Sequence, residues 1–195
     1  MIRTDFFEGN TYHIHEKVKW FKFENVYHVV NETGGKLGTV KQRMTGVQKI
    51  RHFFLGKFRP LAPFKLEIIS PEDRVYAIIS RGWNFKRGTI TITDPNSNTL
   101  AVIKNKCKWL KANFTIEDPY GLQIAEISSN WKAKEFSIKD VNNFSMGQIS
   151  KKWNGLAKEL TYANQYHVNV DPAHTQHKIA IFCAAITMDM TFRNR

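Results

Sequence analysis

Lys178 to Phe192 reads KIAIFCAAITMDMTF and is the least polar run of the sequence. Apolar side chains fall on nearly every side of a helix built from it, and a helix without a polar face either spans a membrane or is enclosed by protein. Such a helix is about 22 Å long, short of the roughly 30 Å hydrocarbon core of a bilayer. Asp189 and the flanking Lys178 and Arg193 also disfavour lipid. We therefore expect a helix over about residues 176–192 that the rest of the chain encloses, rather than a short membrane anchor.

The sequence before this helix repeats one pattern five times. The repeats align on Asn31, Ser70, Asp94, Asp118 and Asp140. Apolar residues stand four and two positions before each of these residues. The turns that contain the aligned residues read NETGG, SPED, DPNSN, EDPYG and KDVNN. Alternation with a period of two on both sides of such a turn predicts a β-hairpin. The residue seven positions later is always Gly or Ala, which we expect to let the strand backbones approach the enclosed helix.

Five hairpins supply ten strands, and residues 12–18 and 160–170 add one at each end. Twelve strands are too many for a barrel that its own side chains fill, because about eight do that. The apolar helix is the available content, and closure also removes exposed sheet edges. The alternative is a β-sandwich with the helix docked outside. We prefer the barrel, as a single domain over residues 1–195, with an insertion at 45–63 in which GVQKIRHFFL favours a short helix.

The segment MGQISKKWNGLAKELTYANQYHVNV, from Met146, resembles the end of the phospholipid scramblases, as does the apolar run after it. Units such as GTITITDPNSNTLAVIK are similar to those that scramblases share with LURP-one-related and tubby C-terminal-like domains. The resemblance runs from about residue 12 to the end, and ISKKWNG at 149–155 is its most specific part. It implies a mainly β fold, a twelve-stranded antiparallel closed barrel around a central helix, in a short bacterial-type member made of this domain alone.

The chain is strongly basic, with 29 Lys and Arg against 17 Asp and Glu and a net charge of +12. Such a balance favours polyanionic partners. In the hairpin arrangement the acidic turns gather at one end of the barrel, and the basic connections between hairpins gather at the other. Trp83, Trp109, Trp131 and Trp153 lie among these bases. The predicted anionic-ligand-binding bases of this rim are Lys41, Arg43, Arg81, Lys86, Arg87, Lys104, Lys106, Lys108, Lys111, Lys132, Lys134, Lys151 and Lys152.

A basic rim that carries indole rings suits an anionic phospholipid surface, because bases are attracted there and Trp favours the headgroup zone. The same rim suits single-stranded nucleic acid, whose bases stack on indoles. A third interpretation is a protein-interaction scaffold. In a purely structural interpretation, the Trp residues cap the core and the lysines are solvated without binding a ligand. We expect a scramblase-like domain that binds anionic phospholipid, with scrambling-related activity and the nucleic-acid alternative left open.

The resemblance also implies calcium-dependent phospholipid movement, as in scramblases, and phosphoinositide binding, as in tubby domains. The scramblase calcium loop, which is similar to an EF-hand loop, matches residues 161–166 here. Tyr162 and Asn164 stand where acidic ligands are expected, and only Asp171 is nearby. Calcium requires several oxygen ligands, usually carboxylates. We therefore expect no calcium site and no cofactor.

The remaining polar groups give weaker signals. His13 and His15 share a strand face, and His174 and His177 stand three apart, but neither pair has the further ligands of a metal site. Asp189 in the enclosed helix is either a functional carboxylate or one that reaches the barrel mouth or a base. No nucleophile context is present, so we expect no enzyme. The two cysteines and the polar N-terminus favour the cytoplasm, with peripheral contact to the inner face of the membrane.

Overall fold

The computed structural model describes residues 5–17, 25–44, 63–82, 88–106, 111–130, 135–152 and 162–192. The expected helix within the insertion at 45–63 lies outside these residues. The helical elements are η1 (Asp5–Phe7), η3 (Pro172–His177) and α2 (Lys178–Phe192). The strands are β1 (Thr11–Lys17), β2 (Val26–Val30), β3 (Lys36–Gln42), β4 (Phe64–Ile69), β5 (Val75–Arg81), β6 (Thr89–Thr93), β7 (Thr99–Asn105), β8 (Lys111–Glu117), β9 (Gln123–Asn130), β10 (Glu135–Asp140), β11 (Ser145–Lys152) and β12 (Tyr162–Val170).

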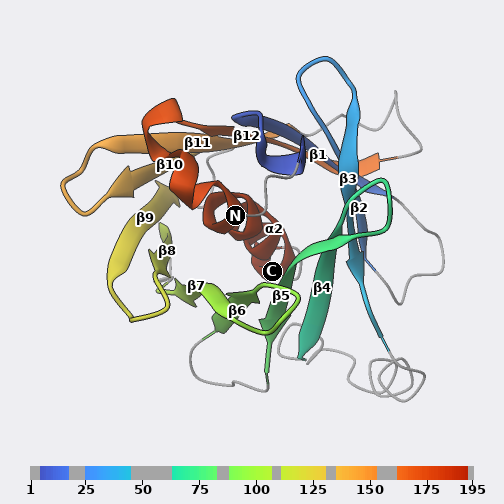
Figure 1. The fold of residues 1–195 in the computed structure, drawn as a ribbon. Coiled ribbons are helices and arrows are strands. Elements are labelled where there is room, and N and C mark those ends of the chain that lie inside the picture. Colours follow the sequence, from blue (N-terminus) through green and yellow to red (C-terminus); the bar gives the residue numbers. More distant parts are fainter. Residues whose placement is uncertain are drawn as a thin grey trace.

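The twelve strands form one closed antiparallel barrel (Figure 1). Each strand pairs with its neighbours in sequence, and the sheet closes because β1 pairs with both β2 and β12. The two strands expected outside the repeats, at 12–18 and 160–170, are β1 and β12. The barrel prediction is therefore confirmed, and the β-sandwich with an outside helix is wrong.

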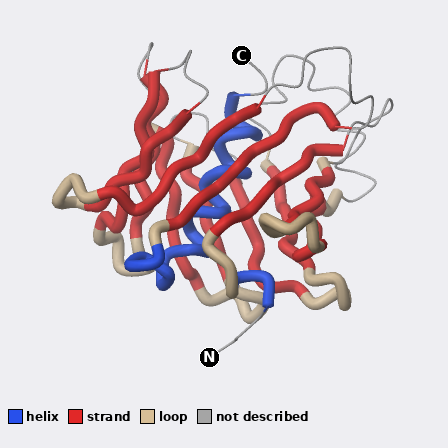
Figure 2. Tube along the Cα trace, turned by 90° about the horizontal axis from the view of Figure 1, so that it is seen from above, coloured by secondary structure: helices blue, strands red, loops and turns tan. Residues whose placement is uncertain are grey.

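The apolar helix runs along the inside of this barrel (Figure 2). Every residue from Ala180 to Asp189 is buried, and the helix packs against β6, β7, β8 and β12. The α-helix begins at Lys178, two residues later than expected, because η3 precedes it. The Asp171 carboxylate accepts a hydrogen bond from the Ala173 backbone N–H at 2.9 Å and so caps η3.

All five hairpins close with the same turn, which explains the residue at the start of each one. At Asp94, for example, the backbone N–H donates to Asn98 and the carbonyl accepts from Ser97. The fourth turn residue has a positive φ in each copy, 69° at Ser97 and 83° at Gly34, as in a type I turn followed by a left-handed residue. The Asp, Asn or Ser side chain at the start then accepts backbone N–H groups of its own turn, as Asp140 does from Asn142 and Phe144 at 2.8 Å each.

A shift of register follows at the same place in every hairpin, so that one residue of the second strand is extra. The small residue comes next, and the Ala members of the set are buried in the core. The Gly members do not serve the approach to the helix that we expected. A Cβ on Gly38 would meet the Ile69 carbonyl oxygen at 2.3 Å, and one on Gly147 would meet that of Asn169 at 2.2 Å. Glycine is required there because the neighbouring strand's backbone lies so close.

The two ends of the barrel differ. We call the end with the five hairpin turns the turn end, and the opposite end, where β1 ends and β2 begins, the connection end. Inside the turn end, Phe6 of η1 packs against Phe182 of α2 with ring centroids 5.3 Å apart, and Tyr12 lies 5.4 Å from the same ring. Lys178 at the start of α2 donates to the Phe7 and Glu8 carbonyls at 3.1 Å each. An aromatic lid therefore closes the turn end.

Candidate functional site

The inside of the connection end is polar, in contrast to the aromatic lid. Asp189, near the end of α2, is 1% exposed and accepts hydrogen bonds from the hydroxyls of Tyr27 at 2.7 Å and Tyr166 at 2.5 Å. Two charge-assisted bonds of this kind stabilise a carboxylate away from water. Asn25 donates to Gln42 at 2.8 Å beside them and to the Met190 sulfur at 3.3 Å. Asp189 thus joins α2 to β2 and β12 inside the connection end, where its partners Tyr27 and Tyr166 are not the expected base and its burial keeps it from the water at the barrel mouth.

Two basic side chains lie above this polar interior. Arg81 continues the inward-facing row of Ala77 and Ile79, and its guanidinium lies 4.8 Å from the Phe64 ring centroid. Burial lowers the pKa of Arg81, although guanidinium groups remain protonated at neutral pH. Lys151 continues the row of Ile149, with its Nζ 5.4 Å from the Tyr166 ring centroid. Both cations lie within the roughly 6 Å of a ring that cation–π attraction requires. The aromatic rings therefore fix two positive charges inside the connection end.

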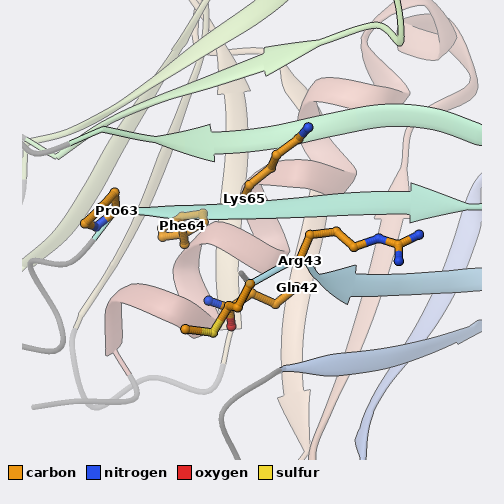
Figure 3. Close-up of a pocket in the computed structure, with 6 residues that line it drawn as sticks. Gln42, Arg43, Pro63, Phe64 and Lys65 are labelled. Atoms are coloured by element: carbon orange, nitrogen blue, oxygen red, sulfur yellow. The ribbon is translucent and has the colours of Figure 1, made fainter. Parts of the chain in front are cut away.

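A pocket of about 100 Å³ opens between β3 and β4 at this end (Figure 3). Its volume is about that of three waters in the liquid, so it is too small for an acyl chain. The Arg43 guanidinium forms an ion pair with Glu67 at 2.8 Å, and the Lys65 Nζ lies 3.8 Å from the same carboxylate. The pocket is lined by Gln42, Arg43, Met44, Pro63, Phe64 and Lys65.

Six of the thirteen predicted bases have described side chains. Lys41, Arg43 and Lys106 are exposed at the connection end, where Arg81 and Lys151 face inward. Lys104 is different, because it forms an ion pair with Glu117 of the neighbouring strand at 2.6 Å and so lies on the barrel wall. Lys111 and Lys152 are placed in β8 and β11 by their backbone alone. Outside the described residues lie Lys86, Arg87, Lys108, Lys132, Lys134 and the four tryptophans Trp83, Trp109, Trp131 and Trp153.

Three acidic residues of the turn end are engaged in their own turns. Asp94, Asp118 and Asp140 begin their turns and accept backbone N–H groups. The hydrogen bonds from Asn98 lower the pKa of Asp94, because they favour its charged form. The expected separation of acidic turns from basic connections therefore holds only in part for the described residues. Exposed Lys36, Arg74 and Lys139 lie at the turn end, and Glu67 and exposed Glu135 lie at the connection end. On the wall, Lys104 pairs with Glu117.

The segment that resembles a calcium loop is an ordinary strand here. Tyr162 and Asn164 belong to β12, which pairs with β1 and β11 along its length. Asp171 is used as the cap of η3. Among the residues that the structure describes, no three His, Cys, Asp or Glu side chains are arranged to hold a metal ion.

The histidines of β1 have partners that the sequence did not indicate. His13 lies opposite His167 of β12 with ring centroids 4.8 Å apart, and His15 lies opposite His28 of β2. The pKa of His28 is lowered by burial and by the cations Lys17, Lys36 and Lys41, together with His15. This outer face of β2, β1 and β12 therefore carries titratable groups beside exposed lysines.

A comparison with protein families decides the family. A model of the family described as Scramblase matches residues 9–195, nearly the whole chain. The chain belongs to the scramblase family. Membership in the scramblase family gives the chain a lipid-related role. Searches of curated proteins and of solved structures find no match. Within the described residues, no helix of the chain is long and apolar enough to cross a membrane.

Sequence reasoning missed the residues that come together only through the barrel. Lys65 and Glu67 face outward on β4 by the period of two, which was a usable signal. Their approach to Arg43 depends on the register of β3 against β4. The two tyrosines around Asp189 come from β2 and β12, the strands that flank β1 but lie far apart in sequence, so no local pattern indicated them.

Proposed function

We propose that this member of the scramblase family is a non-enzymatic domain that binds anionic phospholipid through its connection end. One observation carries the proposal: of the exposed bases that the structure describes, five lie at that end and three at the turn end, where exposed carboxylates lie among them. The exposed bases of the connection end are Lys17, Lys41, Arg43, Lys65 and Lys106.

The strength of such binding follows from the number of bases. Each base near an anionic leaflet contributes about 1 kcal/mol, and Arg43 is paired with Glu67, so the other four contribute about 4 kcal/mol. A free energy of that size corresponds to a dissociation constant of about 1 mM. These four bases alone therefore give weak, salt-sensitive binding, and the remaining predicted bases of the rim would strengthen it.

The pocket beside β3 and β4 supplies a place for a headgroup phosphate. Arg43 and Lys65 lie at its edge, and their charge is partly balanced by Glu67. An anion that reaches the pocket would compete with Glu67 for Arg43. A guanidinium binds phosphate as readily as carboxylate, through the same pair of N–H donors. The proposal therefore places a phosphate-bearing headgroup here and leaves the acyl chains in the bilayer.

Co-sedimentation with vesicles tests the proposal. Vesicles that contain phosphatidylserine should bind the protein at low salt, phosphatidylcholine vesicles should bind it less, and added salt should remove the difference, because exposed charges are screened. Equal binding to both vesicles at low salt would sink the proposal. A salt-dependent mobility shift with a single-stranded oligonucleotide, without a preference for anionic vesicles, would decide for the nucleic-acid alternative.

A further inference from the structure

Two neighbouring turns at the turn end carry large apolar side chains in water. These are the turn between β8 and β9 and the turn between β10 and β11, which are adjacent because β9 pairs with β10. Figure 1 shows both turns, yellow and orange, extending outward from the barrel wall. We call the four side chains the apolar turn pair. They are Tyr120, 90% exposed, Leu122, 68%, Val141, 62%, and Phe144, 67%, and they are the exposed large hydrophobic residues of the described chain.

The turn geometry does not require these side chains. The other three hairpins close with the same backbone hydrogen bonds and carry small, polar, charged or proline residues at the same positions. Where Tyr120 stands, the other turns have Thr33, Glu72 and Asn96. The position of Leu122 and Phe144 is taken by Gly35, Arg74 and Asn98. Three copies of the turn thus show that it forms without a large exposed apolar side chain. The four side chains are therefore not explained by the turn, and an exposed apolar cluster of this kind indicates an interaction site.

The charges around the apolar turn pair do not oppose contact with a neutral lipid surface. Asp118 and Asp140 accept backbone N–H groups within these two turns, and Glu117 forms its ion pair with Lys104. Lys139 is exposed beside them. The local charge is therefore mixed, with the carboxylates of Asp118 and Asp140 beside one exposed lysine, unlike the basic connection end.

The size of the surface separates a lipid from a protein partner. A fully covered aromatic side chain buries about 150–250 Å², so the two partly exposed aromatic rings and the smaller Leu122 and Val141 together offer roughly 500 Å². A stable protein interface buries about 800 Å² on each partner. Four side chains on two projecting turns fall below that, whereas insertion into the boundary between headgroups and acyl chains requires only apolar area and tolerates a Tyr hydroxyl at the water side.

We propose that the apolar turn pair inserts into the headgroup–acyl boundary of a phospholipid bilayer. The inference rests on the lipid-binding function proposed above and adds a second contact of different chemistry. The connection end acts through charge, and the apolar turn pair acts through buried apolar area. Since the two contacts lie at opposite ends of the barrel, one flat bilayer engages one of them at a time.

Binding of the full chain to phosphatidylcholine vesicles at high salt tests this contact, because screening removes the contribution of the bases. The wild type should bind under these conditions. Tyr120→Ser with Phe144→Ser should bind at least about tenfold more weakly, because most of the aromatic area is removed. The matched control is Asn96→Ser with Asn142→Ser, two exposed polar turn positions. It should stay within about twofold of the wild type.

The outcomes separate this contact from the proposed function. The insertion is overturned if the wild type does not bind at high salt, or if the Tyr120→Ser, Phe144→Ser variant binds as tightly as the wild type. The preference for anionic vesicles at low salt is a separate measurement and tests the proposed function alone. Sedimentation velocity decides between a bilayer and a second copy of the chain as the partner of this surface. A wild-type dimer that the same two substitutions dissociate, without an effect on vesicle binding, would assign the surface to a second copy of the chain and overturn the insertion.

Discussion

The turn end and the connection end are built from the same strands by different rules. At the turn end, one turn is used five times, with its own side-chain cap and its own register shift. At the connection end the described residues show no such repetition: a pocket, two inward cations and a buried carboxylate meet there. The repeated turn thus determines the residues of the turn end, whereas no repeated turn restricts the residues of the connection end, which can carry charge. This is the usual division between a scaffold and the loops that carry function.

The largest expected effect tests whether both ends share one core. Ala184 is 0% exposed in the middle of α2. Ala184→Lys places an ammonium group in the apolar lumen and should prevent folding, as loss of near-ultraviolet circular dichroism, because a buried unpaired charge is very costly. Thr175→Lys adds the same charge at an exposed position of η3 and should fold normally. A folded Ala184→Lys protein that loses only vesicle binding would place the helix in the membrane instead.

The next effect compares the interiors of the two ends. Tyr27→Phe removes a hydrogen bond to the buried Asp189 carboxylate and should lower the free energy of unfolding by about 2 kcal/mol in urea denaturation. Tyr12→Phe, at the turn end, removes a bond to the Gly9 carbonyl and should cost about 0.5–1 kcal/mol. Equal losses in the free energy of unfolding would show that a hydrogen bond inside the connection end stabilises the fold no more than one at the aromatic lid.

A smaller effect compares the two ends of a single strand. Asp140 at the turn end of β10 accepts two backbone N–H groups, and Asp140→Ala should lower the free energy of unfolding by about 1–2 kcal/mol. Glu135 begins the same strand at the connection end and is exposed. Glu135→Ala removes the same charge and should change stability by less than about 0.5 kcal/mol. Chemical denaturation of both variants decides whether the repeated turn residue is structural.

The smallest effect concerns the wall between the ends. Burial and the cations Lys17, Lys36 and Lys41 hold the pKa of His28 below its ordinary 6.5, so protonation favours the unfolded state. The free energy of unfolding should therefore be greatest above about pH 6.5 and fall as the pH drops below it. His28→Asn should reduce that dependence in denaturation curves measured between about pH 7 and 5. An unchanged slope would mean that other groups dominate the acid response.

The fold could be predicted because its information is local and repeated. A turn that begins with Asp94 or Asp140 is specified within five residues, and five copies fix the strand count. The enclosed helix followed from its apolarity and the need to fill a twelve-stranded barrel. The lid formed by Phe6 and Phe7 was missed, because nothing in a short N-terminal segment indicates where it packs.

The candidate site could be predicted only in part. The exposure of Lys41 and Lys106 follows from strand periodicity and hairpin order. The pairing of Arg43 with Glu67 does not, because a long connection separates β3 from β4 and turn geometry cannot set their register. Likewise, the apolar turn pair could be recognised only once the other three turns proved to have the same backbone geometry without apolar residues.

The central claim is that the two ends bind lipid by different means, with charge acting at the connection end alone. Two triple charge reversals test it: Lys41, Lys65 and Lys106 to Glu at the connection end, and Lys36, Arg74 and Lys139 to Glu at the turn end, all exposed in the wild type. The measurement is the gain in binding from neutral to phosphatidylserine-containing vesicles at low salt. The connection-end variant should lose about a hundredfold or more, at about 1 kcal/mol per base, and the turn-end variant less than about threefold. Equal losses, or a larger loss in the turn-end variant, would contradict the account.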